Sequence, residues 1–233
     1  MQNSNYQILA DEPHFIVINK SPNVHFHSQD GSAGVVAQVE ADYDLSLFPV
    51  HRLDTPTSGL LLLAKSSAAA NQLAEQFKQR LTEKYYLAIA KGKPKKKQGW
   101  VVGDMTKSRR SMHKLLHTKA NPAITQFYSH TITEGLRLYL LKPHTGRTHQ
   151  LRVALSSLGV PILGDDLYGK QQSDRCYLHA YALKFQFNQQ TYQYVCLPSV
   201  GEEFQRKSFK VQLEHWESPF ELMWPKRDKK KGL

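Results

Sequence analysis

Residues 51–59 have the sequence His51-Arg-Leu-Asp-Thr-Pro-Thr-Ser-Gly59 and lead directly into the apolar run Leu60 to Ala64. This short run predicts a buried strand, which would hold the preceding loop firmly in place. Asp54 is the carboxylate of the loop, and two interpretations of it stay open: it caps its own turn, or it is presented for chemistry. The order His-Arg-Leu-Asp does not match a protein-kinase catalytic loop, and the chain contains no glycine-rich phosphate loop.

Strand and helix patterns alternate on both sides of this loop. The predicted strands share short β-branched, alternating or continuously apolar stretches, and they cover residues 15–19, 60–64, 85–90, 123–130, 136–141, 184–187 and 191–195. A helix is predicted after Ser66 and Ser67, because apolar side chains then recur at helical spacing from Ala70 to Leu81. The mixture predicts one α+β domain over residues 1–225, followed by a disordered basic tail over residues 226–233.

Local signals predict further helix ends and turns in the second half of the chain. Thr148 is the expected N-cap of a short helix that ends at Gly159, where a left-handed residue costs least. Ser199 and Glu202 have the spacing of a capping box for a last helix. The segment 188–190 separates two strand patterns and predicts a hairpin turn.

Residues 91–119 are rich in basic side chains and have little periodic apolar content. They predict a long loop or a hairpin with a mobile tip. The runs Lys93 to Lys97 and Lys107 to Lys114 are candidate clamps for a nucleic-acid backbone. The alternative is a solvated surface that serves only solubility.

The whole chain is strongly basic, with 31 Lys and Arg residues against 20 Asp and Glu residues, a formal net charge of +11 and a pI of about 9.6. Such a charge favours a polyanionic partner, and nucleic acid is favoured over a membrane surface because no long basic amphipathic helix is present. The apolar runs are too short to cross a bilayer. Cys176 and Cys196 form no CxxC pair, so we expect free thiols in a reducing cytoplasm.

A second polar cluster, Gly146-Arg-Thr-His-Gln-Leu-Arg152, lies where a strand pattern ends and a helix pattern begins. Backbone amides at a helix start, with Arg147, His149 and Arg152 around them, suit a phosphate or a protein carboxylate. The alternative is an ordinary basic helix start. A third cluster, from Gly159 to Gly169, holds two acids and a tyrosine and by itself predicts only a loop.

Taken together, these segments resemble the RluA family of pseudouridine synthases. Residues 51–59 are similar to the catalytic-aspartate motif of the family, and Lys84-Tyr-Tyr-Leu-Ala88 is similar to its K-x-Y-x-A motif. Residues 146–152 and 161–169 are similar to its C-terminal motifs, and residues 178–180 match a smaller one. The matches keep the order of the family. Few residues precede the first predicted strand, so we expect no S4 RNA-binding domain of the kind that many relatives carry.

The resemblance implies a pseudouridine synthase fold, with a mixed, mainly antiparallel sheet flanked by helices and loops and a central RNA-binding cleft. It implies an enzyme that isomerises uridines to pseudouridine in structured RNA, either transfer RNA or ribosomal RNA. This isomerisation needs a group that attacks C1′ of the ribose or C6 of the base, and a carboxylate can do either. Asp54 is therefore the expected catalytic residue. Burial disfavours its ionised form, so a nearby cation is needed to hold it charged.

The resemblance also assigns roles to other residues. It favours Arg147 as the cation that pairs with Asp54, with Arg52 as the competing candidate, and it assigns Tyr86 to stacking on the target base and to proton removal from C5. The residues expected to bind substrate are His51, Arg52, Thr57, Lys84, His149 and Arg152. The target uridine must be flipped out of the folded RNA to reach them.

We expect no metal, no nucleotide and no organic cofactor, because His25 and His27 lack a third ligand and the isomerisation needs no redox partner. RNA is the expected partner, and a monomer is the expected state. Two alternatives stay open: a catalytically silent protein that binds or folds RNA, and an RNA hydrolase that uses Asp54 and His51 as acid and base. Retained RNA binding with lost isomerisation in Asp54→Asn would distinguish the enzyme from the silent protein.

Overall fold

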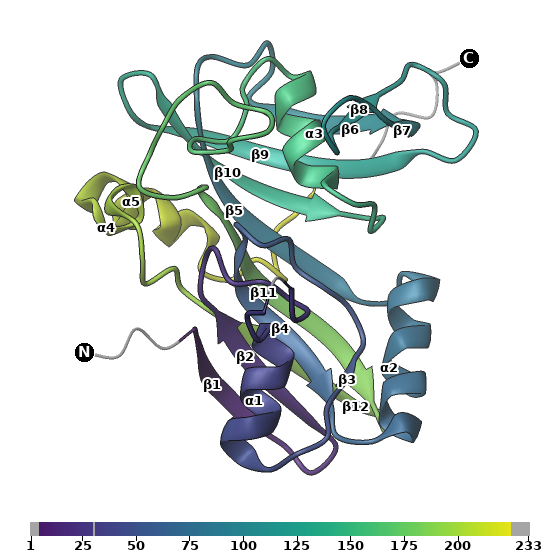
Figure 1. Cartoon of the computed structure of the whole chain (residues 1–233). Helices are drawn as coiled ribbons and strands as arrows, with labels where there is room; N and C mark the ends of the chain where they lie inside the picture. The colour runs from purple at the N-terminus through teal and green to yellow at the C-terminus, as the bar shows by residue number, and fades with distance from the viewer. Residues whose placement is uncertain (1–4, 30, 225–233) are drawn as a thin grey trace.

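The computed structural model describes residues 5–29 and 31–224, so the predicted basic tail lies outside the described residues. Ten strands form one large sheet with the main order β1-β2-β4-β11-β5-β10-β9-β6, to which β12 is added beside β11 and β3 beside β4 (Figure 1). These strands are β1 (Tyr6–Asp11), β2 (Phe15–Lys20), β3 (Phe48–Pro49), β4 (Ser58–Ala64), β5 (Glu83–Lys91), β6 (Gln98–Gly103), β9 (Ala123–Thr133), β10 (Leu136–Pro143), β11 (Leu178–Phe187) and β12 (Gln190–Val195). Only β4 and β11 pair in parallel among the described strands, which confirms the mixed, mainly antiparallel sheet.

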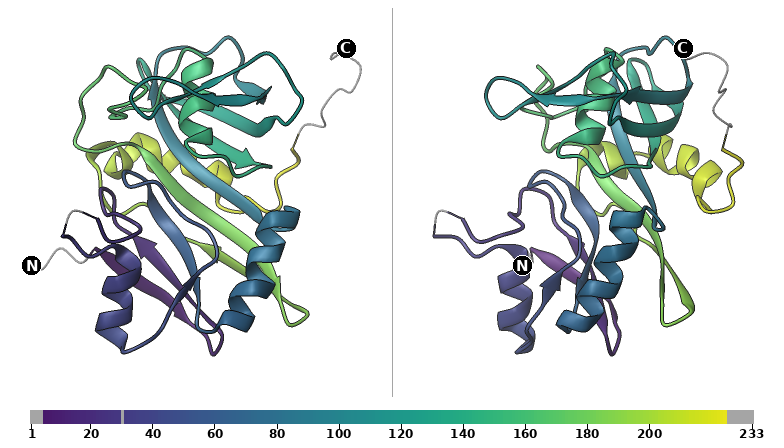
Figure 2. Two further views of the ribbon diagram at one scale, coloured as in Figure 1. Left: turned by 45° about the vertical axis from the view of Figure 1, so that its right-hand side comes forward. Right: turned by 90° about the vertical axis from the view of Figure 1, so that its right-hand side faces the viewer.

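Helices flank this sheet in both halves of the molecule. The helices are α1 (Val35–Tyr43), α2 (Ser67–Gln79), α3 (Gln150–Ser157), α4 (Glu202–Gln205), α5 (Lys207–Leu213) and the 3-10 helix η1 (Glu214–Trp216). Both views of Figure 2 place α1 and α2 in the lower half and α3 in the upper half, and α3 contacts residues 113–115 of the basic region. The fold class is therefore α+β, as predicted.

Two apolar cores share the sheet. One core surrounds β5, β9, β10 and α3, and the other surrounds β2, β4, α1 and α2. β11 belongs to both, because Leu178 and Tyr181 pack in the first core while Ala180 and Phe185 pack in the second. Tyr86 packs against both cores and so lies at the junction between the two halves.

The register of three strands brings the Asp54 loop next to Tyr86. Gly59 at the start of β4 pairs with Ala180 in β11, and Ala180 pairs on its other side with Tyr86 in β5. Gly59 has φ +108°, and a Cβ added there would lie 2.3 Å from the carbonyl oxygen of Ala180. Only glycine permits this close approach, so Gly59 fixes the position of the loop that precedes it.

The basic region 91–119 contains more regular structure than the sequence predicted. Residues 98–103 form β6, which pairs with β9, and β7 (Met105–Lys107) pairs with β8 (His113–Leu115) as a separate two-stranded ribbon. Arg110 and Ser111 turn this ribbon with φ values of 52° and 60°. The hairpin alternative is confirmed for β7 and β8. Neither alternative predicted β6, because its pairing with a distant strand leaves no local signal.

The predicted helix caps have mixed outcomes. Ser66 is confirmed as the N-cap of α2, since its hydroxyl accepts from the amide of Ala69. Thr148 is not a cap, because α3 begins at Gln150 after a left-handed residue at position 149. The predicted capping box at Ser199 is also wrong: Gly201 precedes α4, and the amide of Glu202 donates instead to the carboxylate of Asp174.

Two predicted turns agree with the structure. Asn188 and Gln189 have φ values of 48° and 66° between β11 and β12, as a two-residue hairpin turn requires. Gly159 follows α3 with φ +76°, the left-handed conformation expected directly after a helix.

Candidate active site

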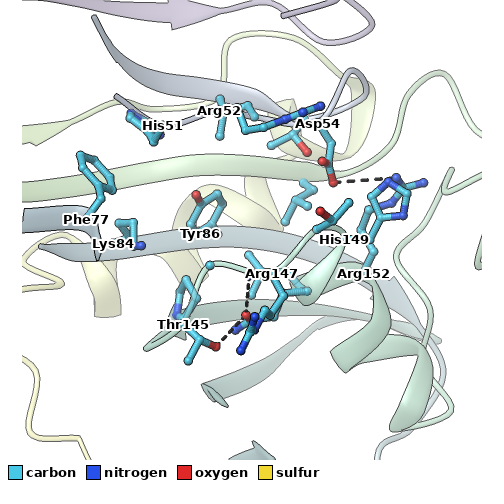
Figure 3. A pocket seen from close by; sticks show the side chains of 18 of the residues that line it. His51, Arg52, Asp54, Phe77, Lys84, Tyr86, Thr145, Arg147, His149 and Arg152 are labelled. Carbon is cyan, nitrogen blue, oxygen red and sulfur yellow. Dashed lines mark hydrogen bonds and ion pairs between the residues drawn. The ribbon is translucent and has the colours of Figure 1, made fainter. Parts of the chain in front are cut away.

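A cavity of about 550 Å³ opens beside Asp54, between the loop that precedes β4, the end of α2, the start of β5 and residues 143–152. All nine candidate site residues from the sequence line it, and Figure 3 labels most of them: His51, Arg52, Asp54, Thr57, Lys84, Tyr86, Arg147, His149 and Arg152. Segments that are far apart in the sequence therefore meet at one place. Their chemical roles stay predictions.

Asp54 forms an ion pair with Arg152. The Asp54 Oδ2 atom lies 3.9 Å from Nη1 of Arg152, and the arginine side chain is only 4% exposed (Figure 3). Asp165 binds the same guanidinium from the other side, with hydrogen bonds of 2.7 Å from Nε and 2.6 Å from Nη2. The Asp165 carboxylate also accepts from the amides of Leu167 and Tyr168. Arg152 is thus fixed between the carboxylates of Asp54 and Asp165. Asp165, which orients it, belongs to the polar cluster from Gly159 to Gly169.

Arg147 does not pair with Asp54 in this structure, which corrects the prediction of the ion-pair partner. Its Nη2 donates to the side chain and backbone oxygens of Asn121. The reason lies in the loop before α3, where the Gln150 side chain accepts from the Arg147 amide and from the hydroxyl of Thr145. These bonds hold the Arg147 backbone on the β9 side of the cavity.

Arg52, the competing candidate, is exposed at the mouth of the cavity. Within residues 5–29 and 31–224 it makes no hydrogen bond or ion pair with another side chain. Its guanidinium therefore stays available for a ligand, whereas that of Arg152 is already occupied by carboxylates.

Tyr86 presents its ring to the cavity across from Arg52 and Asp54 (Figure 3). Burial raises the pKa of its phenol, and the nearby Asp54 carboxylate raises it further. The phenol is therefore neutral at physiological pH. Such a ring can stack on a base and can donate a hydrogen bond, but it does not stand ready as a phenolate.

His51 is locked in place rather than poised for proton transfer. Its Nε2 accepts from the amide of Leu62 at 3.0 Å, and its ring stacks on Phe77 with the centroids 4.6 Å apart. Burial and the Lys84 charge lower the pKa of His51 to about 3. A histidine that is neutral at pH 7, with Nε2 engaged by the backbone, does not supply the acid that the hydrolase alternative needs.

Lys84 and His149 complete the polar lining on opposite sides of the cavity. The Lys84 ammonium lies 5.4 Å from the centroid of the Phe77 ring, and burial lowers its pKa. The His149 Nδ1 atom lies 3.0 Å from the hydroxyl of Tyr168, which also accepts from the amide of His113 in β8. This tyrosine therefore ties the basic β7–β8 ribbon to the start of α3.

A buried lysine, Lys20, binds the backbone of the loop that carries Asp54. Lys20 is fully buried, and its Nζ donates to the carbonyls of Ser21, Val24 and Thr55 at 2.9, 2.9 and 3.1 Å. Burial and a neighbouring arginine lower the pKa of Lys20 to about 7, although Asp54 opposes this shift. This contact was not predictable from the sequence, because a lysine at a strand end is ordinarily solvated.

A second buried network holds the residue that follows the loop. Ser58 accepts from Nη2 of Arg175 at 2.7 Å, and its hydroxyl lies 2.7 Å from Nδ1 of His179. The Nε2 atom of His179 lies 2.9 Å from the carbonyl of Cys196. Because a carbonyl can only accept, His179 carries its proton on Nε2 and accepts from Ser58 at Nδ1. Burial lowers the pKa of His179 to about 3.

No group of three His, Cys, Asp or Glu side chains in the described part of the chain could hold a metal ion. His25 instead lies 3.2 Å from the hydroxyl of Thr55, so it also contacts the catalytic-motif loop. None of the described helices is long and apolar enough to cross a membrane.

Comparison with known proteins agrees with this arrangement. Residues 14–157 match the family model described as RNA pseudouridylate synthase. The chain belongs to this family. Members of the family act on RNA, so this protein is an RNA pseudouridine synthase and RNA is its partner. The alternative of a catalytically silent RNA-binding protein finds no support among the relatives.

Individual relatives have the same family names. The chain is 45% identical over 199 residues to a Haemophilus influenzae protein named uncharacterized RNA pseudouridine synthase, covering 84% of this chain and 89% of that protein. It is 37% identical to the ribosomal large subunit pseudouridine synthase C of Rickettsia bellii, covering 74% of this chain but only 61% of that longer protein. The solved structure of human RNA pseudouridylate synthase domain containing 1 shares the fold, with a TM-score of 0.73, 24% identity and coverage of 95% of this chain and 97% of that one.

Proposed function

We propose that the protein converts specific uridines of transfer RNA, ribosomal RNA or both to pseudouridine, with Asp54 as the catalytic residue. The observation that carries this proposal is the position of the Asp54 carboxylate: it lines the cavity, faces the Tyr86 ring and lies 3.9 Å from a guanidinium that is itself fixed by Asp165. A cation that is itself fixed holds the carboxylate in one orientation toward the cavity, as a nucleophile requires.

The reaction is an isomerisation, so every heavy atom of the uridine is kept and the C5 hydrogen lost to solvent is balanced by a proton gained at N1. The N1–C1′ bond breaks, a C5–C1′ bond forms, the proton on C5 leaves, and N1 gains a proton. Asp54 begins this sequence by attacking either C1′ of the ribose or C6 of the base, and both routes end with the carboxylate released. The chemistry needs no cofactor, because no electron or group is gained or lost overall.

Tyr86 stacks on the flipped uracil and keeps it in the plane that Asp54 can reach. Its neutral phenol suits this task, since a raised pKa disfavours the phenolate. The proton on C5 therefore passes to an acceptor other than an ionised Tyr86. The Asp54 carboxylate, released at the end of either route, is the nearest group of the right charge.

The cations around the cavity hold the RNA while the base is flipped. Arg52, Lys84 and Arg147 surround the mouth, and the β7–β8 ribbon adds Arg109 and Arg110 at its turn. Flipping a base costs a few kcal/mol, which phosphate contacts and stacking on Tyr86 offset.

The protein acts as a monomer in the reducing cytoplasm. The buried thiols of its two cysteines stay protonated there, because burial raises the pKa of each to about 12.

Tritium release from RNA labelled at C5 of uridine tests this proposal. Transfer RNA and ribosomal RNA fractions are assayed separately with the wild type, with Asp54→Asn and with Asp166→Asn. Asp166 is an exposed neighbouring carboxylate outside the cavity lining, so it serves as the matched control. We expect Asp54→Asn to lose about a thousandfold or more in rate, while its RNA affinity stays within about tenfold and Asp166→Asn behaves as the wild type. Equal rates for the wild type and Asp54→Asn would refute the assigned role.

A further inference from the structure

A second cavity of about 380 Å³ lies at the opposite end of β10 from the active site. Its walls come from the segment before β6, the last residues of β9, the start of β10 and α5. β6 ends its pairing with β9 at Tyr128, so the part of β9 that follows has no partner strand on that side. The cavity occupies the region beside this uncovered part of the strand.

A buried arginine lines the cavity. Arg137 is only 7% exposed, and its guanidinium donates to the hydroxyl of Thr131 at 2.6 Å and to the carbonyl of Ser129 at 2.9 Å. Its Nε and Nη2 atoms also contact the Ser129 hydroxyl, at 3.3 and 3.1 Å. All of these acceptors are neutral oxygens. The buried hydroxyl of Tyr139 also lies close to this guanidinium. The cavity therefore offers a ligand the positive charge of Arg137, held in place by neutral oxygens.

No carboxylate balances this charge within the described residues. Arg137, Lys97, His130 and His215 make no ion pair there, although the first three line the cavity and His215 lies against His130 with their ring centroids 5.8 Å apart. Partial burial lowers the pKa of His130, and the charges of His215, Arg137 and Lys97 lower it further. No acidic group appears among the charges that act on this histidine. A buried guanidinium in such a setting normally requires an anion.

We propose that this second cavity binds a phosphate group, with the Arg137 guanidinium and the Lys97 ammonium as its two cationic contacts. A phosphate presents several oxygens in different directions, so it can meet cations on two walls and the amide of Gln212 on a third. The Ser129 hydroxyl is excluded as a donor to the ligand, because it already donates to the carbonyl of Lys97 at 2.7 Å. That bond fixes the backbone of Lys97 beside the cavity.

The phosphate has two possible sources with the same chemistry. Arg137 lies six positions before Pro143, which lines the active site, so the two cavities lie about 20 Å apart along β10. A backbone phosphate of the RNA that reaches into the active site is one source, and a free phosphate or nucleotide is the other. Only the first source rests on the proposed function.

Titration with inorganic phosphate and with uridine monophosphate, followed by the NMR signals of the His130 ring, tests the site without any RNA. The variants are Lys97→Gln and Lys96→Gln, because Lys96 is an equally exposed lysine of the same segment that does not line the cavity. We expect the wild-type signals to shift on titration. We expect Lys97→Gln to weaken phosphate binding about tenfold, while Lys96→Gln stays within about twofold.

A second variant protects the test against misfolding. Arg137→Lys keeps the charge but loses the planar fork of the guanidinium, so phosphate binding should weaken while the far-ultraviolet circular dichroism stays unchanged. The proposal is overturned if phosphate leaves the wild-type His130 signals unmoved. It is equally overturned if Lys97→Gln and Lys96→Gln bind phosphate alike.

RNA binding at several salt concentrations then identifies the source. For an RNA backbone phosphate, we expect Lys97→Gln to reduce the salt slope by about 0.7 relative to Lys96→Gln, and inorganic phosphate to compete with RNA. For a free phosphate, Lys97→Gln and Lys96→Gln have the same salt slope for RNA binding, while inorganic phosphate still shifts the His130 signals of the wild type. Either of these two results supports a phosphate site in the second cavity. Tritium release by the wild type is measured in parallel, so a failure of the proposed function is recognised separately.

Discussion

Two groups of polar side chains in the active-site cavity are held in opposite ways. Asp54 and the residues around it are held through buried partners: Asp165 holds Arg152, Lys20 holds the carbonyl of Thr55, and His179 holds Ser58. Arg52, on the same loop as Asp54, is exposed and lacks a partner among the described residues. The difference separates two tasks, because a reacting charge requires a fixed environment and a folded RNA requires side chains that can adapt to its shape.

Removing the Asp165 carboxylate, which binds Arg152, should have the largest effect on stability and activity. Asp165→Asn breaks a buried ion pair, which typically costs about 3–5 kcal/mol of unfolding free energy. We expect this loss in urea unfolding, together with a kcat that falls far more than the RNA affinity, because Arg152 loses its orientation. Asp166→Asn, the exposed neighbour, is the control and should change stability by less than about 0.5 kcal/mol. Wild-type stability in Asp165→Asn would show that Asp54 and the residues around it are not held in this way.

The pH dependence of stability tests the network beneath the loop. His179 has a pKa of about 3 when folded and about 6.5 when unfolded, so below pH 6.5 the unfolded chain binds one proton more and stability falls. Between pH 7.5 and pH 5.0 this group should remove about 2 kcal/mol. We expect the wild type to lose about 2 kcal/mol more than His179→Gln over this range.

The control for this prediction is His27→Gln, since His27 is exposed. Urea unfolding at the two pH values measures all three proteins. His51 acts in the same direction as His179, so a residual pH dependence is expected in His179→Gln. An identical pH dependence in wild type and His179→Gln would mean that His179 is charged in the folded state.

The smallest effect on stability is expected at Arg52. Arg52→Gln should leave the unfolding free energy within about 0.5 kcal/mol and weaken RNA binding severalfold. Since one phosphate contact is lost, the slope of log affinity against log salt should decrease by about 0.7–0.9. Lys210→Gln, which removes an exposed charge on α5, should leave the slope unchanged. If Arg52→Gln and Lys210→Gln have equal slopes, Arg52 is not one of the side chains that contact RNA phosphates.

Local sequence patterns predicted part of the regular structure: Ser66 and the apolar spacing that follows predicted α2, whereas α1 and β1 were not predicted. The resemblance to the RluA family supplied the nine predicted site residues, and each of them lines the cavity. This success has a physical basis. Caps, turns and alternation depend on neighbours in the chain, and the same short segments carry the polar residues.

Contacts between distant segments were beyond these patterns. The partner of Asp54 depends on where α3 begins, and the shift of that start from Thr148 to Gln150 comes with a Gln150 side chain that binds the Arg147 backbone. In the same way, β6 depends on pairing with β9, and the support of Ser58 by Arg175 joins residues 117 positions apart. Neither contact is visible in a local window.

The pairing of β4 with β11 has a consequence for the order in which the protein is made. Ser58 and His179 are separated by 121 positions, and the row that joins Gly59, Ala180 and Tyr86 needs β11 as its middle strand. During synthesis, a chain that has emerged only as far as α3 already contains Asp54, Tyr86 and Arg152 but has no strand to hold them together. We therefore expect the nascent protein to stay inactive until β11 has left the ribosome and has paired with β4 and β5.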